Sequence, residues 1–263
     1  MDKDETNVHY NGVRMETRAQ RARGPLYQLK LVHNNWKRVL LQRYAFGAGL
    51  LLDLGCGRGG DTQKWVDCHI RQVHGVDTNS TLIREAIRRS VRSRGKTTCT
   101  FQVHDCRLPY HPMMTYDVVT TFFCVHYFCE TEEICRTFVQ SVSSALRSQG
   151  FWMGICLDSG KVTSWIRNGM TSPHLSIQNV SVDMTGDVGF GQAYRYTLED
   201  TVTQSTNRSE GSLEYLVPME KLITLARDMD LDLLSLTPCE IPAGEYPGVL
   251  ASEMCMEFVF VKK

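Results

Sequence analysis

The chain has 263 residues, of which 42% are hydrophobic, and its 29 lysine and arginine residues balance 29 aspartate and glutamate residues. This length and composition predict one globular domain with appendages and leave too little chain for two full domains. The net charge of zero argues against a protein that holds long nucleic acid by charge alone, because such binding depends on a large basic excess.

The sequence shows no secretion signal or membrane span. Residues 1–11 are polar and charged, and no apolar run approaches the roughly 18 residues that a span requires. Several of the ten cysteines lie in apolar segments, where a buried thiol packs as an ordinary hydrophobic group. We therefore expect an intracellular protein with free thiols. No metal is expected, since Cys124, His126 and Cys129 have no second C-x-x-C pair to complete a tetrahedral site.

In chain order, residues 1–44 predict a basic, helical N-terminal arm, and residues 45–263 predict the main domain. From Leu50 onward, strand and helix signals alternate. Strands are expected near residues 50–55, 73–77, 99–103, 116–124 and 150–156, with helices near 60–68, 80–93 and 131–147. This alternation predicts a Rossmann-like α/β fold, in which helices cover both faces of a mostly parallel sheet.

After Asp158 this rhythm changes. Residues 159–212 are rich in Ser, Thr, Asn and Gly, which predicts an insertion of short strands and loops on the ligand side of the sheet. A helix is expected over 216–229, followed by strands near 232–237 and 254–262. The simplest arrangement is an antiparallel pair that closes one edge of the sheet.

The segment LLDLGCGRGGD, Leu51–Asp61, predicts a buried strand that turns sharply into a helix. Glycines such as Gly55 and Gly57 allow the turn and let a ligand lie against bare backbone. The next predicted strand ends in Asp77, where a carboxylate is placed to accept hydrogen bonds from ribose hydroxyls. These features favour a cofactor that contains a nucleoside.

The glycine spacing indicates which cofactor. A dinucleotide site would have the pattern G-x-G-x-x-G, whereas this chain has D-x-G-x-G-x-G-G beginning at Asp53. That carboxylate would repel a pyrophosphate but suits the amino group of S-adenosylmethionine. The motif therefore favours a methyltransferase over the alternative of a plain glycine-rich turn.

Ligands of parallel α/β sheets bind beyond the carboxyl ends of the strands. This places Asp53, Asp77, Asp105 and the His126-Tyr127 pair on one rim, although they are far apart in the sequence.

An ordered set of motifs runs through nearly the whole chain. It comprises His9-Tyr10-Asn11, Asn34-Asn35-Trp36, DLGCGRGGD from Asp53, GVD at 75–77, Asp105, His126-Tyr127, YRYTLED from Tyr194 and LEYLVP from Leu213. This set resembles the mRNA cap guanine-N7 methyltransferase family. The resemblance implies a class I methyltransferase fold with a seven-stranded sheet, S-adenosylmethionine as cofactor, and methyl transfer to N7 of the guanine of GpppN-RNA during mRNA capping.

The resemblance also implies a set of cofactor-binding residues: Lys37, Arg38, Asp53, Gly55, Gly57, Asp77, Asp105, Cys106 and Phe122. In that set, Asp53 and Gly55 hold the methionine end, Asp77 the ribose, and Asp105 with Cys106 the adenine. A basic residue of the arm meets the cofactor carboxylate. Alignment from Trp36 makes it Arg38, and alignment from Tyr10 makes it Lys37. For either one, the alternative is an ordinary solvent-facing helix charge.

For the cap, the resemblance implies a pocket formed by Asn34, His126, Tyr127 and Glu214. Glu214 would read guanine, because a carboxylate accepts from both N1–H and the N2 amine, a contact that adenine cannot satisfy. His126 and Tyr127 would contact the base nearby. No general base is expected, since guanine N7 carries a lone pair and no proton.

This chain departs from the family pattern at three places. Phe122 replaces a usual Gln, Leu157 replaces a usual Pro, and the position of a usual aromatic falls at Cys255 or Met256. The alternatives are therefore a methyltransferase with another nucleotide or small-molecule acceptor, and a methyltransferase-like subunit that supports a catalytic partner.

The expected partner is the capped RNA end, with a capping-enzyme or activating subunit as a further possibility. The chain is expected to be monomeric, and to act in the nucleus if cellular or the cytoplasm if viral.

Overall fold

A computed structural model of the chain describes residues 22–92, 95–112, 114–199 and 211–263. The helices are α3 (Tyr27–Tyr44), α4 (Thr62–Asp67), α5 (Ser80–Arg92), the 3-10 helix η1 (Val125–Phe128), α6 (Glu132–Ala145), α7 (Ser159–Arg167), α8 (Met219–Arg227) and α9 (Val249–Glu253). The strands are β1 (Leu50–Leu54), β2 (Gln72–Asp77), β3 (Thr98–Val103), β4 (Tyr116–Phe122), β5 (Leu146–Leu157), β6 (Leu175–Asn179), β7 (Ala193–Leu198), β8 (Ser212–Tyr215), β9 (Leu231–Pro238) and β10 (Cys255–Lys262). His9-Tyr10-Asn11 lies outside the described residues.

A seven-stranded sheet forms the centre of the molecule, with the strand order β3-β2-β1-β4-β5-β10-β9. Strands β1 to β5 run parallel, and β10 is antiparallel to both β5 and β9. The predicted α/β fold and its antiparallel closing pair are therefore confirmed. Because the first five strands are parallel, their carboxyl ends lie at one edge, where ligands of such sheets bind.

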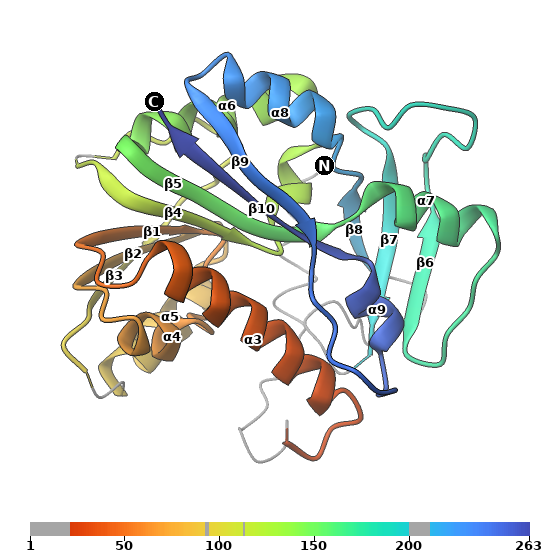
Figure 1. Cartoon of the computed structure of the whole chain (residues 1–263), viewed down its shortest axis with the longest axis horizontal. Coiled ribbons are helices and arrows are strands. Elements are labelled where there is room, and N and C mark those ends of the chain that lie inside the picture. The colour runs from red at the N-terminus through yellow and green to blue at the C-terminus, as the bar shows by residue number, and fades with distance from the viewer. Residues whose placement is uncertain (1–21, 93–94, 113, 200–210) are drawn as a thin grey trace.

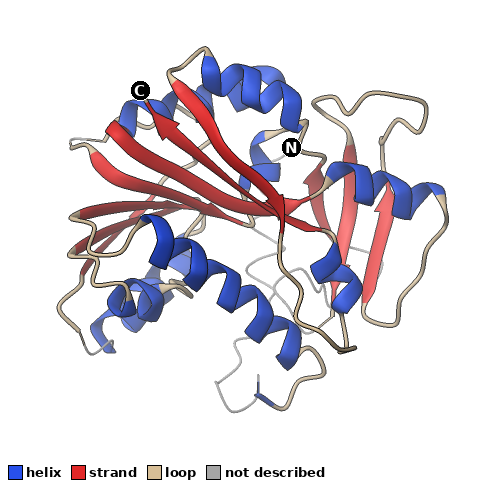
Figure 2. Ribbon diagram, in the orientation of Figure 1, coloured by secondary structure: helices blue, strands red, loops and turns tan. Residues whose placement is uncertain are grey.

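Helices cover both faces of this sheet, with α3, α4 and α5 on one face and α6 and α8 on the other (Figures 1 and 2). The central strands are apolar on both sides, as buried parallel strands require. Leu51 and Val118 pack into the core beneath α3, whereas their neighbours Leu52 and Val119 pack into the core that includes α6.

A second, three-stranded antiparallel sheet, β6-β7-β8, lies beside the central one (Figure 1). Its last strand, β8, continues to Tyr215, so the added sheet extends past residue 212. The helix expected from residue 216 begins only at Met219 and ends at Arg227. The expectation was wrong at its start because Pro218 stands at the N-cap and disfavours helical backbone in the residue before it.

The arm helix α3 is fixed by its buried face. Trp36 is 4% exposed, stacks on His33 with ring centres 4.7 Å apart, and donates from Nε1 to the carbonyl oxygen of Glu240. His33 Nε2 in turn lies 3.1 Å from Ser252 Oγ in α9. These contacts hold α3 against the segment between β9 and β10, which fixes Lys37, the residue after Trp36.

We expect Trp36→Ala to lower the free energy of unfolding by about 3–5 kcal/mol, because it removes a buried indole and leaves a cavity. Val39→Ala is the matched control, since Val39 lies on the same helix and is 41% exposed. Its cost should stay within about 0.5 kcal/mol. Urea unfolding of both variants measures the difference, and equal costs would contradict the anchoring role of Trp36.

Candidate active site

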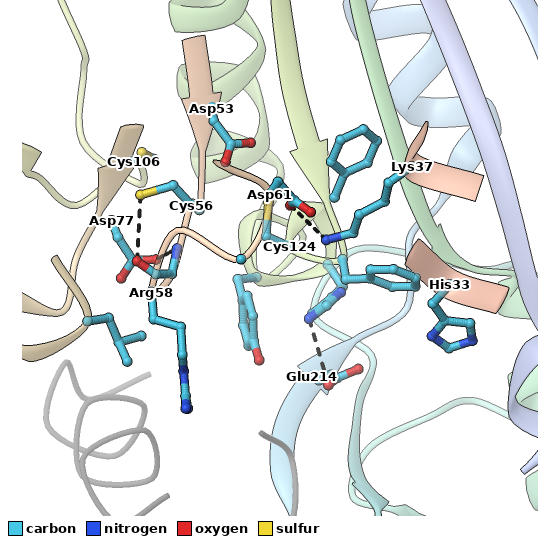
Figure 3. A pocket seen from close by; sticks show the side chains of 18 of the residues that line it. His33, Lys37, Asp53, Cys56, Arg58, Asp61, Asp77, Cys106, Cys124 and Glu214 are labelled. Atoms are coloured by element: carbon cyan, nitrogen blue, oxygen red, sulfur yellow. Dashed lines mark hydrogen bonds and ion pairs between the residues drawn. The ribbon is translucent and has the colours of Figure 1, made fainter. Parts of the chain in front are cut away.

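A cavity of about 430 Å³ lies at the carboxyl edge of the parallel strands. Its volume falls within the usual range for small-molecule sites. Residues from α3, the glycine loop after β1, the ends of β2 to β4, η1, β7, β8 and β10 line it. Figure 3 shows Asp53, Asp77, Lys37 and Glu214 from separate elements around this one space. The convergence on one rim that the sequence predicts is therefore present.

The glycine loop turns because of a specific close approach. Gly55 has a φ of 77°, and a Cβ atom there would lie 2.8 Å from the Sγ of Cys124. Its backbone N–H donates to the carbonyl oxygen of Val76 at 2.8 Å, so β1 ends against β2. A larger residue at Gly55 would disturb both the turn and the floor of the cavity.

Asp77 holds the loop from the neighbouring strand. Its Oδ2 accepts from the N–H of Gly57 at 2.9 Å, and its Oδ1 accepts from the N–H of Asn79 at 2.9 Å. Burial raises the pKa of Asp77, and these two backbone donors oppose the shift. The carboxylate therefore has a fixed orientation at the end of β2.

Asp53 is 3% exposed and accepts a hydrogen bond from Thr120 Oγ1 at 2.6 Å. Burial, together with the negative charge of Asp61, raises the pKa of Asp53 to about 7. Such a carboxyl group gains most from a ligand that brings a positive charge, because the ligand offsets the cost of ionising it.

Two ammonium groups flank Asp61. Its Oδ2 lies 2.9 Å from Lys37 Nζ, and its Oδ1 lies 2.7 Å from Lys64 Nζ. Burial alone would raise the pKa of Asp61, but the two positive charges outweigh it and hold the pKa below its usual value. This cluster connects the arm helix to the first turn after the glycine loop.

Of the two basic residues proposed for the cofactor carboxylate, Lys37 lines the cavity. Its ammonium group lies 5.2 Å from the ring centre of Phe122 and 5.5 Å from that of Phe123. Arg38 is exposed and does not line the cavity. The rotation of α3 about its axis therefore places Lys37 at the cavity, which favours the alignment that begins at Tyr10.

Asp105 and Cys106, which follow β3, line the cavity on the glycine-loop side. The guanidinium group of Arg107 donates to both oxygens of the Asp105 carboxylate, at 3.1 Å to Oδ1 and 3.0 Å to Oδ2. Burial raises the pKa of Cys106, so this thiol remains neutral. This part of the cavity wall therefore combines a fixed acid with a neutral thiol.

Glu214 of β8 lies at the opposite end, 3% exposed, and accepts a hydrogen bond from the Tyr194 hydroxyl at 3.1 Å. His126 Nε2 lies 3.8 Å from Glu214 Oε1, and neither ring nitrogen of His126 has a hydrogen-bond partner within the described residues. Burial raises the pKa of Glu214 to about 8 and lowers the pKa of His126 to about 3. Within the described residues, the two ring nitrogens of His126 therefore remain available to a ligand, beside a carboxyl group held by Tyr194.

Tyr127 and Asn34 also line the cavity. The Tyr127 hydroxyl lies 2.8 Å from Ser212 Oγ, and its ring centre is 4.1 Å from that of His126. Asn34 donates from Nδ2 to the carbonyl oxygen of Lys30 at 2.6 Å. All the residues predicted from the sequence to bind ligand, apart from Arg38, therefore line this cavity.

The three departures from the family pattern also meet here. Phe122, Leu157 and Cys255 line the cavity, whereas Met256 does not. Cys255 of β10 is directly paired with Leu157 of the adjacent antiparallel strand β5. Strand alternation explains why Cys255 lines the cavity and Met256 does not, because neighbouring residues of a strand point to opposite faces.

Sequence reasoning assigned no role to Asp61, Lys64 or Tyr194. The spacing of Asp61 and Lys64 could have indicated their pairing, since residues three apart on a helix meet. Tyr194 gave no such signal, because its contact with Glu214 depends on the register between β7 and β8. In the part of the chain that the structure describes, no cluster of His, Cys, Asp or Glu is arranged to hold a metal ion, and no helix is long and apolar enough to cross a membrane.

Solved structures similar to this chain include methyltransferases. The N-methyltransferase NodS from Bradyrhizobium japonicum, in complex with S-adenosyl-L-homocysteine, matches 99% of this chain and 99% of its own with a TM-score of 0.59 and 14% identity. The glycopeptide N-methyltransferase MtfA, complexed with S-adenosyl-L-methionine, matches 88% of this chain and 94% of its own with a TM-score of 0.57 and 13% identity. At these identities the similarity concerns the fold, which is that of class I methyltransferases.

Sequence relatives carry a more specific name. The mRNA cap guanine-N(7) methyltransferase of Saccharomyces cerevisiae is 30% identical over 88% of this chain, which spans 57% of that protein. The mRNA cap guanine-N(7) methyltransferase 1 of Oryza sativa is 26% identical over 86% of this chain, which spans 64% of that protein. The sequence profile of the mRNA (guanine-N(7))-methyltransferase domain matches residues 2–241. Because that match covers most of its length, the chain belongs to the mRNA (guanine-N(7))-methyltransferase domain family.

Proposed function

We propose that this chain transfers a methyl group from S-adenosylmethionine to N7 of the guanine that caps GpppN-RNA. One observation carries the proposal: a single cavity is lined both by a glycine loop with fixed carboxylates and by buried Glu214 beside His126, whose ring nitrogens have no partner within the described residues. Membership of the cap methyltransferase family supports the same reaction.

The residues at the glycine-loop end suit the cofactor. Asp53 would receive the amino group of the methionine end, and this would favour the ionised form of a carboxyl group whose pKa burial raises. Lys37 would meet the cofactor carboxylate. The fixed oxygens of Asp77 would accept from the ribose hydroxyls, and Asp105 with Cys106 would border the adenine. When bound, the cofactor supplies an electrophilic methyl group on a sulfonium sulfur.

The residues at the other end suit guanine. Ionised Glu214 accepts from guanine N1–H and from the N2 amine, and adenine lacks this pair of donors. His126 adds a ring nitrogen without a protein partner among the described residues, which suits a contact with the base edge. Tyr127 contributes a ring beside His126.

Catalysis of this kind needs positioning rather than proton removal. Guanine N7 has no proton, so no side chain must act as a base. Holding two reactants in line is worth about 7–11 kcal/mol of the barrier. Buried carboxylates such as Asp53 and Glu214 also stabilise positive charge at either end of the cavity.

The proposed partner is the capped end of an RNA chain. A nuclear site of action accompanies this proposal, because the named relatives are eukaryotic mRNA cap methyltransferases. The monomeric state and a capping-enzyme or activating subunit stay predictions.

We expect Glu214→Gln to lower kcat/KM for GpppG-capped RNA by about 100-fold, because the amide loses the carboxylate's two-point contact with guanine. Glu220→Gln is the matched control, since Glu220 is an exposed carboxylate on α8. The assay follows methyl transfer from labelled cofactor to GpppG-capped, ApppG-capped and triphosphate-ended RNA.

Methylation at N7 of the GpppG end alone is the expected result for the wild type. Equal transfer to ApppG ends would contradict guanine reading by Glu214. Absence of transfer to all three RNAs, with cofactor bound, would overturn the proposed reaction in favour of another acceptor or a supporting role.

We expect Lys37→Ala to weaken binding of S-adenosylhomocysteine by about 10- to 100-fold, because a partly buried charge-assisted contact is lost. Arg38→Ala, which removes the neighbouring but exposed cation, should change the Kd by less than about threefold. Isothermal titration calorimetry of the two variants measures this contrast. The reverse order of effects would return the cofactor contact to Arg38.

A further inference from the structure

We propose that Tyr194 is a positioning residue that fixes the guanine-reading carboxylate of Glu214 in the orientation that guanine requires. The inference rests on the proposed function, because it concerns the same site. It adds a residue that reaches the ligand only through Glu214.

The register of the added sheet creates this contact. Tyr194 of β7 and Glu214 of β8 are directly paired across the two strands. The Tyr194 hydroxyl donates to Glu214 Oε2 at 3.1 Å. Tyr194 is 1% exposed and does not line the cavity, whereas Glu214 does. The phenol therefore holds the carboxylate from behind, on the side away from the ligand space.

A planar two-point contact depends on the orientation of the carboxylate. Without a second anchor, the terminal torsion of a glutamate is broad, and binding has to restrict it. The hydrogen bond to Oε2 restricts that torsion in advance. Each carboxylate oxygen has more than one lone pair, so the bond to Tyr194 leaves acceptor sites for a base. Glu214 Oε1 meanwhile lies 3.8 Å from His126 Nε2.

The same hydrogen bond favours the charged form of Glu214. The titratable groups that the described residues bring close to this carboxylate are Tyr194 and Tyr196 from β7 and His126 from η1. Burial raises the pKa of Glu214 to about 8, and the Tyr194 bond opposes that shift. Removing the phenol oxygen should therefore raise the pKa further and reduce the ionised fraction near neutral pH.

The experiment compares Tyr194→Phe with wild type in methyl transfer to GpppG-capped RNA between about pH 6 and about pH 9. We expect KM for the capped RNA to rise about tenfold while kcat changes by less than about threefold, because ground-state binding of the base is weakened. The pH above which KM falls should be higher in Tyr194→Phe than in the wild type. Preference for GpppG over inosine-capped IpppG ends should fall, since inosine lacks the N2 amine that a correctly oriented carboxylate accepts.

Tyr116→Phe is the matched control. Tyr116 is also 1% exposed, and its hydroxyl lies 2.6 Å from His74 Nδ1, but it begins β4 and does not line the cavity. Its loss should lower stability without moving the pH profile of KM or the preference for guanine. Equal effects of the two variants on those readouts would overturn the proposal.

A second measurement does not depend on activity. In the cofactor-free protein, Tyr194→Phe should lower stability more at about pH 9 than at about pH 6, because a bond to a carboxylate is stronger than one to a neutral carboxyl group. In a Glu214→Gln background this pH dependence should vanish. An identical loss at both pH values would overturn the proposal.

If wild type leaves GpppG-capped RNA unmethylated, the proposed function fails, while these unfolding data still decide whether Tyr194 holds the carboxylate.

Discussion

The contact between Lys37 and Asp61 joins the two parts of the chain on which the cavity depends. Lys37 belongs to the arm helix, and Asp61 follows the glycine loop, so their 2.9 Å contact connects α3 to the end of β1. Lys64, only 3% exposed, supplies a second positive charge to the same carboxylate. A buried acid between two lysines is stable only while both partners remain in place. The position of the arm helix is therefore coupled to the shape of the glycine loop.

Burial of carboxyl groups explains why the cavity suits ligands that carry positive charge or hydrogen-bond donors. Asp53 and Glu214 lie at opposite ends, and burial raises the pKa of each. A carboxyl group in this state resists ionisation until a ligand supplies compensating donors. By linkage, each group stabilises the empty protein fully below its ordinary pKa and loses that contribution as the pH rises through its raised value. The stability of the empty site therefore falls as the pH rises through about 7 for Asp53 and about 8 for Glu214, while its affinity for donors increases.

The sequence predicts the residues at the strand ends that line the site better than it predicts the contacts that hold those residues in place. Asp53 and Asp77 are predictable because parallel strands end at one edge. That Lys37 and not Arg38 lines the cavity depends on the rotation of α3 about its axis, since adjacent helical residues point about 100° apart. The Tyr194 contact required the register of β7 against β8, which one-residue slips would change completely. Local patterns thus identify residues at strand ends, whereas contacts between separately folded segments depend on packing that one sequence does not specify.

The departures from the family pattern have a common physical consequence. Phe122, Leu157 and Cys255 place apolar or weakly polar surface around the cavity, and Lys37 lies over the Phe122 ring. Apolar walls lower the local dielectric and strengthen each remaining polar contact. A base that leaves the Glu214 carboxylate without donors is then strongly disfavoured, because an unsatisfied buried charge is costly. Under the proposed function, the ionised form of Glu214 would favour guanine, whose N1–H and N2 amine supply two donors, over adenine, which lacks that pair.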